Sequence, residues 1–101
     1  MGVAQHLVSA DNDEGRVTTW TFPAAGAATG QHRHEFDYVV VPITGGRFEV
    51  VDVDGSVRMM NQVAGSQYLG TAGTDHDVVS AADGEAVFVE IELKRTPVED
   101  V

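Results

Sequence analysis

The stretch GAATGQHRHEFDYVVVPITG, residues 26–45, carries two histidines, His32 and His34, within a long β-prone run. Side chains at positions i and i+2 of a strand point to the same face, so we expect both imidazoles on one side of the strand. A second stretch, GSQYLGTAGTDHDVVS (residues 65–80), places His76 at the start of another predicted strand after a glycine-rich turn. Three imidazoles from two strands could bind one face of a metal ion and leave its other positions open. Two solvent-facing histidines on a strand would look the same in sequence.

Glycines divide the rest of the chain into short runs rich in valine, threonine, tyrosine and phenylalanine. Such runs, separated by frequent turn signals, are typical of an all-β sandwich or barrel, and we expect a closed barrel. Strands are predicted over residues 16–22, 31–41, 47–52, 56–63, 65–69, 75–80 and 86–94. Asp54-Gly55 is a strong hairpin signal. No segment has a sustained helical period, although Met59-Met60 and residues 96–101 are open between helix and strand.

The last predicted strand has a regular alternation. Three apolar residues, Val89, Ile91 and Leu93, alternate with two glutamates. We therefore expect the apolar face to be buried and Glu90 and Glu92 to meet water.

The chain has 101 residues, of which 16 are acidic and 6 basic, and a net charge of -10. Its length predicts one domain over residues 1–101. A surface this acidic repels phosphate backbones and anionic lipids, so neither nucleic acids nor membranes are expected partners. No apolar stretch approaches the roughly 20 residues of a transmembrane helix and no secretory signal is visible, so we expect a cytoplasmic protein. Because cysteine is absent, disulfides, iron–sulfur clusters and thiol nucleophiles are excluded.

The first histidine stretch resembles the first motif of the cupin superfamily in order and spacing. That motif is glycine, five residues, His-x-His, three or four residues, glutamate, six residues and glycine. The corresponding residues here are Gly26, His32, His34, Tyr38 and Gly45. Tyr38 therefore stands where the family has a glutamate.

The second stretch resembles the second cupin motif. That motif is glycine, five residues, Pro-x-Gly, two residues, histidine, three residues and asparagine. The corresponding residues here are Gly65, Thr71-Ala72-Gly73, His76 and Ser80, with threonine and serine in place of proline and asparagine. Together the two motifs span more than half of the chain.

The resemblance implies a single-domain cupin, which is a double-stranded β-helix or jelly-roll barrel. It also implies a divalent metal ion held inside by His32, His34 and His76. Iron(II) is the first expectation, and zinc, nickel, manganese and copper are alternatives because imidazole accepts each of them. The missing glutamate is a usual fourth ligand in the family. Three neutral imidazoles leave the ion its full charge, which favours an anionic substrate.

No nearby acid is expected to replace that glutamate. Alternation predicts that Tyr38 points inward with the histidines and that Glu35 and Asp37 point away. Asp77 is one residue out of phase with the histidine before it. A phenol with a pKa of about 10 is a poor ligand for a divalent ion. We interpret Tyr38 as the catalytic candidate, a hydrogen-bond or proton donor to bound substrate, or else as a barrel-lining aromatic; the fourth histidine, His6, is interpreted as a surface residue.

Some cupin dioxygenases that act on thiols or diketones have a similar ferrous site with three histidines. The resemblance thus implies a dioxygenase or related oxidoreductase that acts on a small anionic organic molecule. The alternative is a non-catalytic cupin that binds a metal or small ligand as an accessory or sensor protein. The runs DYVVVP (residues 37–42) and VFVEIELK (residues 87–94) also resemble short bacterial cupins, at least one of them associated with β-alanine degradation.

A homodimer is expected from the outward face of the first motif strand. Val39, Val41 and Ile43 make that face apolar too, so both faces of the strand favour burial. The simplest solution is a two-fold dimer packed sheet against sheet, as is common among cupins.

Overall fold

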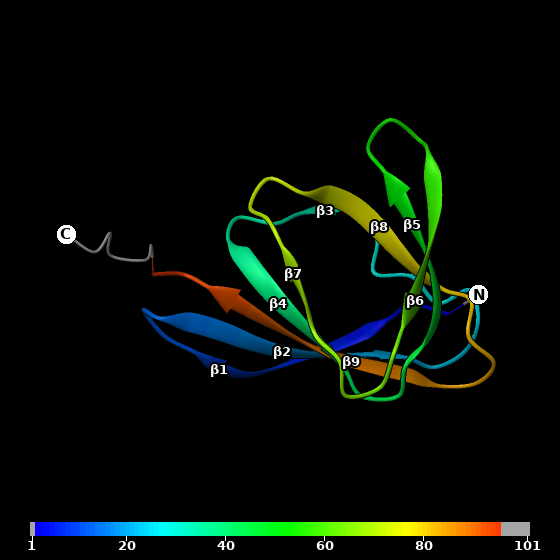
Figure 1. Cartoon of the computed structure of the whole chain (residues 1–101), viewed down its shortest axis with the longest axis horizontal. Coiled ribbons are helices and arrows are strands. Elements are labelled where there is room, and N and C mark those ends of the chain that lie inside the picture. Colours follow the sequence, from blue (N-terminus) through cyan, green and yellow to red (C-terminus); the bar gives the residue numbers. More distant parts are fainter. Residues whose placement is uncertain (1, 96–101) are drawn as a thin grey trace.

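The computed structural model describes residues 2–95, which form nine β-strands and no helix (Figure 1). The strands are β1 (Gln5–Asp11), β2 (Gly15–Phe22), β3 (His32–Arg33), β4 (Asp37–Pro42), β5 (Gly46–Asp52), β6 (Val57–Gln62), β7 (Tyr68–Gly70), β8 (Asp75–Ser80) and β9 (Ala86–Leu93). Residues 2–95 thus contain no helix long and apolar enough to cross a membrane. Residues 96–101, with their open assignment, lie outside the described residues. The cytoplasmic location stays a prediction.

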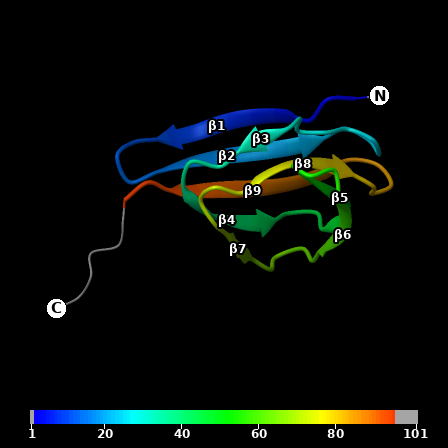
Figure 2. The same cartoon turned by 90° about the horizontal axis from the view of Figure 1, so that it is seen from above.

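The strands form two antiparallel sheets around a common interior. One has the order β1-β2-β9-β4-β7 and the other the order β3-β8-β5-β6. Figure 1 shows β3, β8 and β5 on one side of the interior and β2 and β9 on the other. Figure 2 shows the strands of the larger sheet side by side, with β1 and β7 at its two edges. The prediction of an all-β fold is confirmed.

Three phenylalanines form the apolar end of the interior. Phe22 of β2, Phe48 of β5 and Phe88 of β9 contact one another, with ring centroids 5.1 to 5.7 Å apart. All three are buried. Phe48 pairs with Ser80 at one end of β8, whereas His76 lies near the other end of that strand. The aromatic core and the histidines therefore occupy different ends of the interior.

Most of the predicted strands are confirmed, with small differences at their ends. β6 is a regular strand, so Met59-Met60 is extended, and the Asp54-Gly55 turn joins β5 to β6. Gly55 has a φ of 87°, a left-handed conformation that glycine adopts without steric cost. The strand predicted over residues 65–69 is shorter and later, as β7.

One strand, β1, was not predicted. It pairs with β2 along the edge of the larger sheet, with His6 opposite Trp20. Every residue of β1 is exposed, so no alternation of apolar and polar residues reveals it in the sequence. Main-chain hydrogen bonds to β2 hold it in place. His6 is a surface residue as predicted, but the segment that carries it is anchored.

The long strand predicted over residues 31–41 is divided. β3 ends at Arg33 and β4 begins at Asp37, so the first motif passes from the smaller sheet to the larger one. The residues predicted to face inward do so on both sides of this break, because His34, Tyr38 and Val40 are all buried.

The phase predicted for β9 is wrong. Glu92 is only 8% exposed, whereas Leu93 is 43% exposed. Phe88 and Glu90 point into the interior with Glu92, and Val89 and Ile91 lie on the outer face. Two carboxylates are tolerated inside because Arg16 lies 3.2 Å from Glu92 and because the interior at this end is a cavity.

Candidate metal centre

Strand pairing brings the two histidine stretches together. His32 of β3 lies directly opposite His76 of β8 in the antiparallel register. His34 follows β3, and its main chain is tied to the turn before β8 on both sides. Its N–H donates to the Thr74 carbonyl at 2.8 Å, and its carbonyl accepts from the Gly73 N–H at 2.8 Å. The backbone pairing therefore brings all three imidazoles to one place.

The three Nε2 atoms converge at one point. His34 Nε2 lies 3.2 Å from His32 Nε2 and 3.2 Å from His76 Nε2. The ligand atoms of the three residues all lie within 4.8 Å of one another. Two nitrogens that each bind one ion at about 2.1 Å are about 3.0 Å apart at a right angle and about 3.4 Å apart at a tetrahedral angle. The two 3.2 Å distances fall between these values, and the three histidines together form a group that could hold a metal ion.

The hydrogen bonds of the imidazoles favour metal binding. His32 Nδ1 lies 2.8 Å from the Gly30 carbonyl, which can only accept, so Nδ1 donates and carries the proton. This tautomer leaves the Nε2 lone pair free for a metal. His34 Nε2 faces two other Nε2 atoms and can donate to only one of them. A cation between the rings would satisfy all three.

Burial also removes protons that would compete with a metal. It lowers the pKa of His34 to about 4, with His32 and His76 adding charge repulsion. Burial likewise lowers the pKa of His76 to about 4, helped by repulsion from His32. Both rings are therefore neutral at pH 7, the form that binds metals.

Tyr38 packs against one of the three histidines. Its ring stacks on the His34 ring, with centroids 3.8 Å apart and planes 18° apart. Gly70 of β7 lies opposite Tyr38 in the sheet, and its missing side chain leaves room for the ring. Burial raises the pKa of the Tyr38 phenol, and the nearby Glu90 raises it further. The phenol stays protonated at neutral pH, so the prediction that it is no anionic ligand agrees with its surroundings. Its catalytic role stays a prediction.

The acids near the motif histidines lie outside the histidine cluster, although Glu35 lines a hollow that also includes His32 and His34. Glu35 and Asp37 are exposed. Asp37 Oδ1 accepts a hydrogen bond from the Ala72 N–H at 2.8 Å, and Asp77 Oδ1 accepts one from the Gly30 N–H at 3.0 Å. These two carboxylates therefore hold the loops around the site rather than entering it.

Glu90 lies beside the histidines and was not among the predicted site residues. Its Oε1 lies 4.0 Å from His34 Nε2, and its side chain is only 12% exposed. Burial raises the Glu90 pKa to about 7; Glu92 raises it too, while a hydrogen bond with Trp20 opposes the rise. Phe88 carried a signal in the sequence. Residues 88 and 90 lie on the same face of the strand, and phenylalanine is among the residues most often buried.

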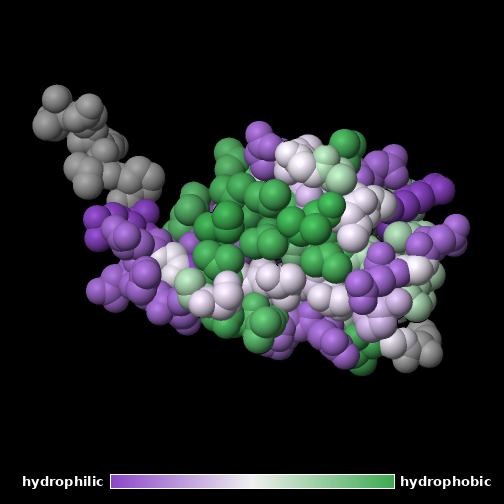
Figure 3. All heavy atoms as spheres, turned by 90° about the horizontal axis from the view of Figure 1, so that it is seen from below, coloured by the Kyte–Doolittle hydropathy of each residue, from purple (hydrophilic) through white to green (hydrophobic). Residues whose placement is uncertain are grey.

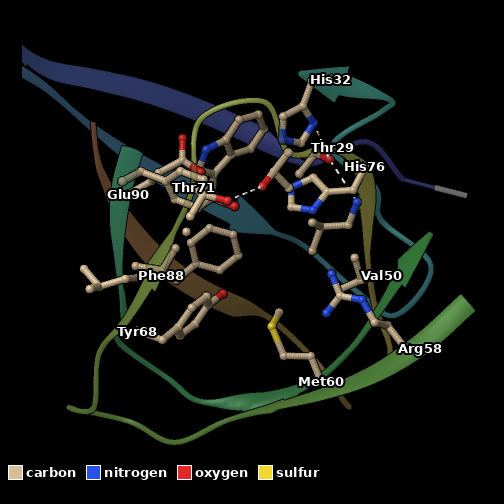
Figure 4. Close-up of a pocket in the computed structure, with 17 residues that line it drawn as sticks. Thr29, His32, Val50, Arg58, Met60, Tyr68, Thr71, His76, Phe88 and Glu90 are labelled. Atoms are coloured by element: carbon tan, nitrogen blue, oxygen red, sulfur yellow. Dashed lines mark hydrogen bonds between the residues drawn. The ribbon is translucent and has the colours of Figure 1, made fainter. Parts of the chain in front are cut away.

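A cavity of about 290 Å³ opens beside His32 and His76 (Figure 4). Its apolar wall includes Val40, Val50, Met60, Val78 and Phe88. Arg58 and Glu90 lie on opposite sides of the cavity, with the Tyr68 hydroxyl between apolar neighbours. The Arg58 side chain is 57% exposed and lies 3.4 Å from the Asp52 carboxylate. A small molecule in this cavity would thus meet the histidines, a cation and an acid.

Comparison with known proteins agrees with this arrangement. The chain is 48% identical over 87 residues to the beta-alanine degradation protein BauB of Pseudomonas aeruginosa, covering 86% of this chain and 90% of that protein. It is 40% identical to a cupin domain from Bordetella pertussis Tohama I, with a TM-score of 0.87, covering 93% of this chain and 96% of that one. The chain is a cupin. No protein-family model matches the sequence.

A more distant solved structure shares the fold alone. A Klebsiella pneumoniae protein with a double-stranded β-helix domain has a TM-score of 0.74 at 19% identity, covering 92% of this chain and 78% of that one. The two sheets of this cupin are therefore the double-stranded β-helix that the motifs predict. Its departure from the family pattern at Tyr38 leaves a site of three histidines with a carboxylate on another strand.

Proposed function

We propose that this cupin binds a divalent metal ion, iron(II) foremost, through His32, His34 and His76 and acts on a small anionic organic molecule. The convergence of the three Nε2 atoms beside an open cavity is the observation that carries the proposal. A bound ion of this kind supplies Lewis-acid chemistry and, if it is iron(II), redox chemistry with dioxygen. A dioxygenase or related oxidoreductase is the reaction class that fits.

The residues of the cavity support an anionic substrate. Arg58 offers a guanidinium that can bind a carboxylate through two parallel hydrogen bonds. The apolar wall excludes water from the rest of the molecule. Tyr38, which also lines the cavity, would donate a hydrogen bond or proton to the substrate from its protonated phenol. The name of the BauB relative suggests β-alanine or another small amino or carboxylic acid as the first class to test.

Metal content tests the proposal. We expect about one equivalent of metal in the wild-type protein after incubation with iron(II), and less than a tenth of that in His34→Ala, because the central ligand of the three is lost. His6→Ala is the matched control, since His6 is exposed and lies outside the cluster. Elemental analysis after gel filtration gives the result. Absence of uptake by the wild type with iron(II), nickel(II) and zinc(II) would contradict metal binding.

Oxygen uptake then separates the enzyme from a binding module. Oxygen consumption by the iron-loaded protein with a small carboxylate supports the oxidoreductase. Ligand affinity without turnover would instead support an accessory or sensor cupin. The absence of the motif glutamate favours this role.

We also propose that a second copy of the chain covers the outer face of the larger sheet. The strand register places Leu69, Val39, Ile91 and Val17 in one row across β7, β4, β9 and β2. Figure 3 shows a continuous hydrophobic area on this side of the molecule. Leu69 is 77% exposed. A chain with a net charge of -10 repels its copies, so an uncharged face is where two copies can meet.

A charge in that row should separate the subunits. We expect Ile91→Glu to be a monomer of 10.8 kDa by light scattering, and the wild type to have twice that mass. Met59→Glu, on an exposed position of the other sheet, is expected to stay a dimer. A wild-type monomer at every concentration would overturn this part of the proposal.

A further inference from the structure

We propose that Glu90 supplies the carboxylate ligand that the first motif lacks, so that the metal is bound by three histidines and one glutamate from a different strand. This inference rests on the metal site proposed above. It differs from the family pattern, in which the glutamate belongs to the motif that holds the first two histidines. Here the carboxylate comes from β9, more than fifty residues later in the chain.

The position of Glu90 carries the inference. It lies opposite Val40 in the sheet, next to the Tyr38 position on β4, and its side chain enters the interior. Two ligand atoms of one ion, each at about 2.1 Å, are between about 3.0 and 4.2 Å apart as the angle between them opens. The 4.0 Å between Glu90 Oε1 and His34 Nε2 falls in that range.

The charges around β9 single out this glutamate. Glu92, the next inward residue, has its own partner in Arg16, whose guanidinium lies 3.2 Å away. For Glu90, the one basic group within ion-pair distance among residues 2–95 is His34. A buried carboxylate without a cation is costly, and a divalent ion between the histidines would supply the missing charge.

The Tyr38 ring occupies the position where the motif glutamate would stand. The ring fills the space beneath His34 and lies in close contact with Gly70 across the sheet. The phenol ring of Tyr38 therefore packs against the His34 ring and leaves the carboxylate position of the motif unfilled. Glu90 lines the same cavity as His32 and His76 (Figure 4).

Metal titration of matched variants tests the inference. Cobalt(II) is added to metal-free wild type, Glu90→Gln, Glu92→Gln and His34→Ala, and binding is followed by quenching of Trp20, the single tryptophan, whose ring stacks on His32. We expect Glu90→Gln to weaken binding at least about tenfold and Glu92→Gln less than about threefold. The visible spectrum of the cobalt complex should change in Glu90→Gln, because a neutral amide replaces the anionic carboxylate ligand. A carboxylate that acts only through its charge would change affinity and leave the spectrum unaltered.

The outcomes separate this inference from the proposal beneath it. Equal cobalt affinity and identical spectra in wild type and Glu90→Gln would overturn the role of Glu90 while the three-histidine site stands. Failure of the wild type to bind cobalt(II), iron(II), nickel(II) or zinc(II) would overturn both. Glu90→His offers a second variant, in which an imidazole replaces the carboxylate and binding should recover above that of Glu90→Gln.

Discussion

Replacing Gly70 by alanine is expected to lower the free energy of unfolding by about 3 kcal/mol or more, at the upper end of the usual cost of overpacking. A Cβ atom at this position would lie within 2.4 Å of three ring atoms of Tyr38. Gly70 has no left-handed φ, so alanine fits its backbone and the cost comes from the collision alone. For a chain of this size the loss corresponds to a melting temperature more than about 10 °C lower.

The collision should also weaken the metal site. The Tyr38 ring is only 5% exposed and stacks on His34, so it cannot move without displacing that imidazole. We therefore expect metal affinity to fall together with stability.

Two variants control this prediction. Gly2→Ala adds a Cβ that meets Ala27 at 3.6 Å, an ordinary contact, and should leave the melting temperature within a few degrees of the wild type. Tyr38→Val removes the ring, so the double variant with Gly70→Ala should lose much less stability than the sum of the two single changes. Additive losses would show that the collision is not the cause.

The second large effect is the response of the metal-free protein to acid. We expect its free energy of unfolding to fall as the pH is lowered from 6.5 to 5. His34 and His76 have folded-state pKa values of about 4 and ordinary values of 6.5, so only the unfolded chain takes up their protons in this range. Stability contributed by their neutral forms is complete above pH 6.5 and is lost toward pH 4.

Glu90 acts in the opposite direction. Its pKa rises from an ordinary 4.5 to about 7 on folding, so between these values the folded state holds a proton that the unfolded state has released. The stability from this group is complete below pH 4.5 and is lost as the pH rises through 7. On unfolding, the two histidines take up about two protons and Glu90 releases about one. This net uptake of about one proton lowers the free energy of unfolding by about 1 kcal/mol for each pH unit of acidification.

Urea unfolding in the presence of a chelator, at one protein concentration, measures these slopes between pH 5 and 6.5. Glu90→Gln removes the opposing proton, so its stability should fall about twice as steeply with decreasing pH as that of the wild type. Contributions from carboxylates elsewhere are common to both proteins and cancel in the comparison. Parallel curves for wild type and variant would contradict the assignment of a buried, protonated Glu90.

Much of this molecule follows from local patterns. The β-prone runs predict an all-β fold, and the His-x-His spacing puts two imidazoles on one face of a strand. The resemblance of the two motifs to the cupin superfamily implies that His76 joins them inside the barrel. The structure brings those three residues together. These predictions succeed because strand alternation and turn chemistry are short-range properties that a few neighbouring residues express.

Other features of the structure cannot be predicted from residues that are neighbours in the sequence. β1 is exposed at every position, and main-chain hydrogen bonds, which any sequence can make, hold it to β2. The contact between Tyr38 and Gly70 joins strands that are adjacent only after folding.

The two glutamates of β9 show the same limit most clearly. Alternation divides a strand into two faces, but it does not say which face is the interior. Pairing with β2 and β4 turns Phe88 and Glu90 inward, and places Val89 and Ile91 in the apolar row on the outer face. Local sequence therefore specified the histidines and the class of fold. The tertiary structure decided which acid stands beside the histidines, because the facing of a strand depends on its neighbours in the sheet.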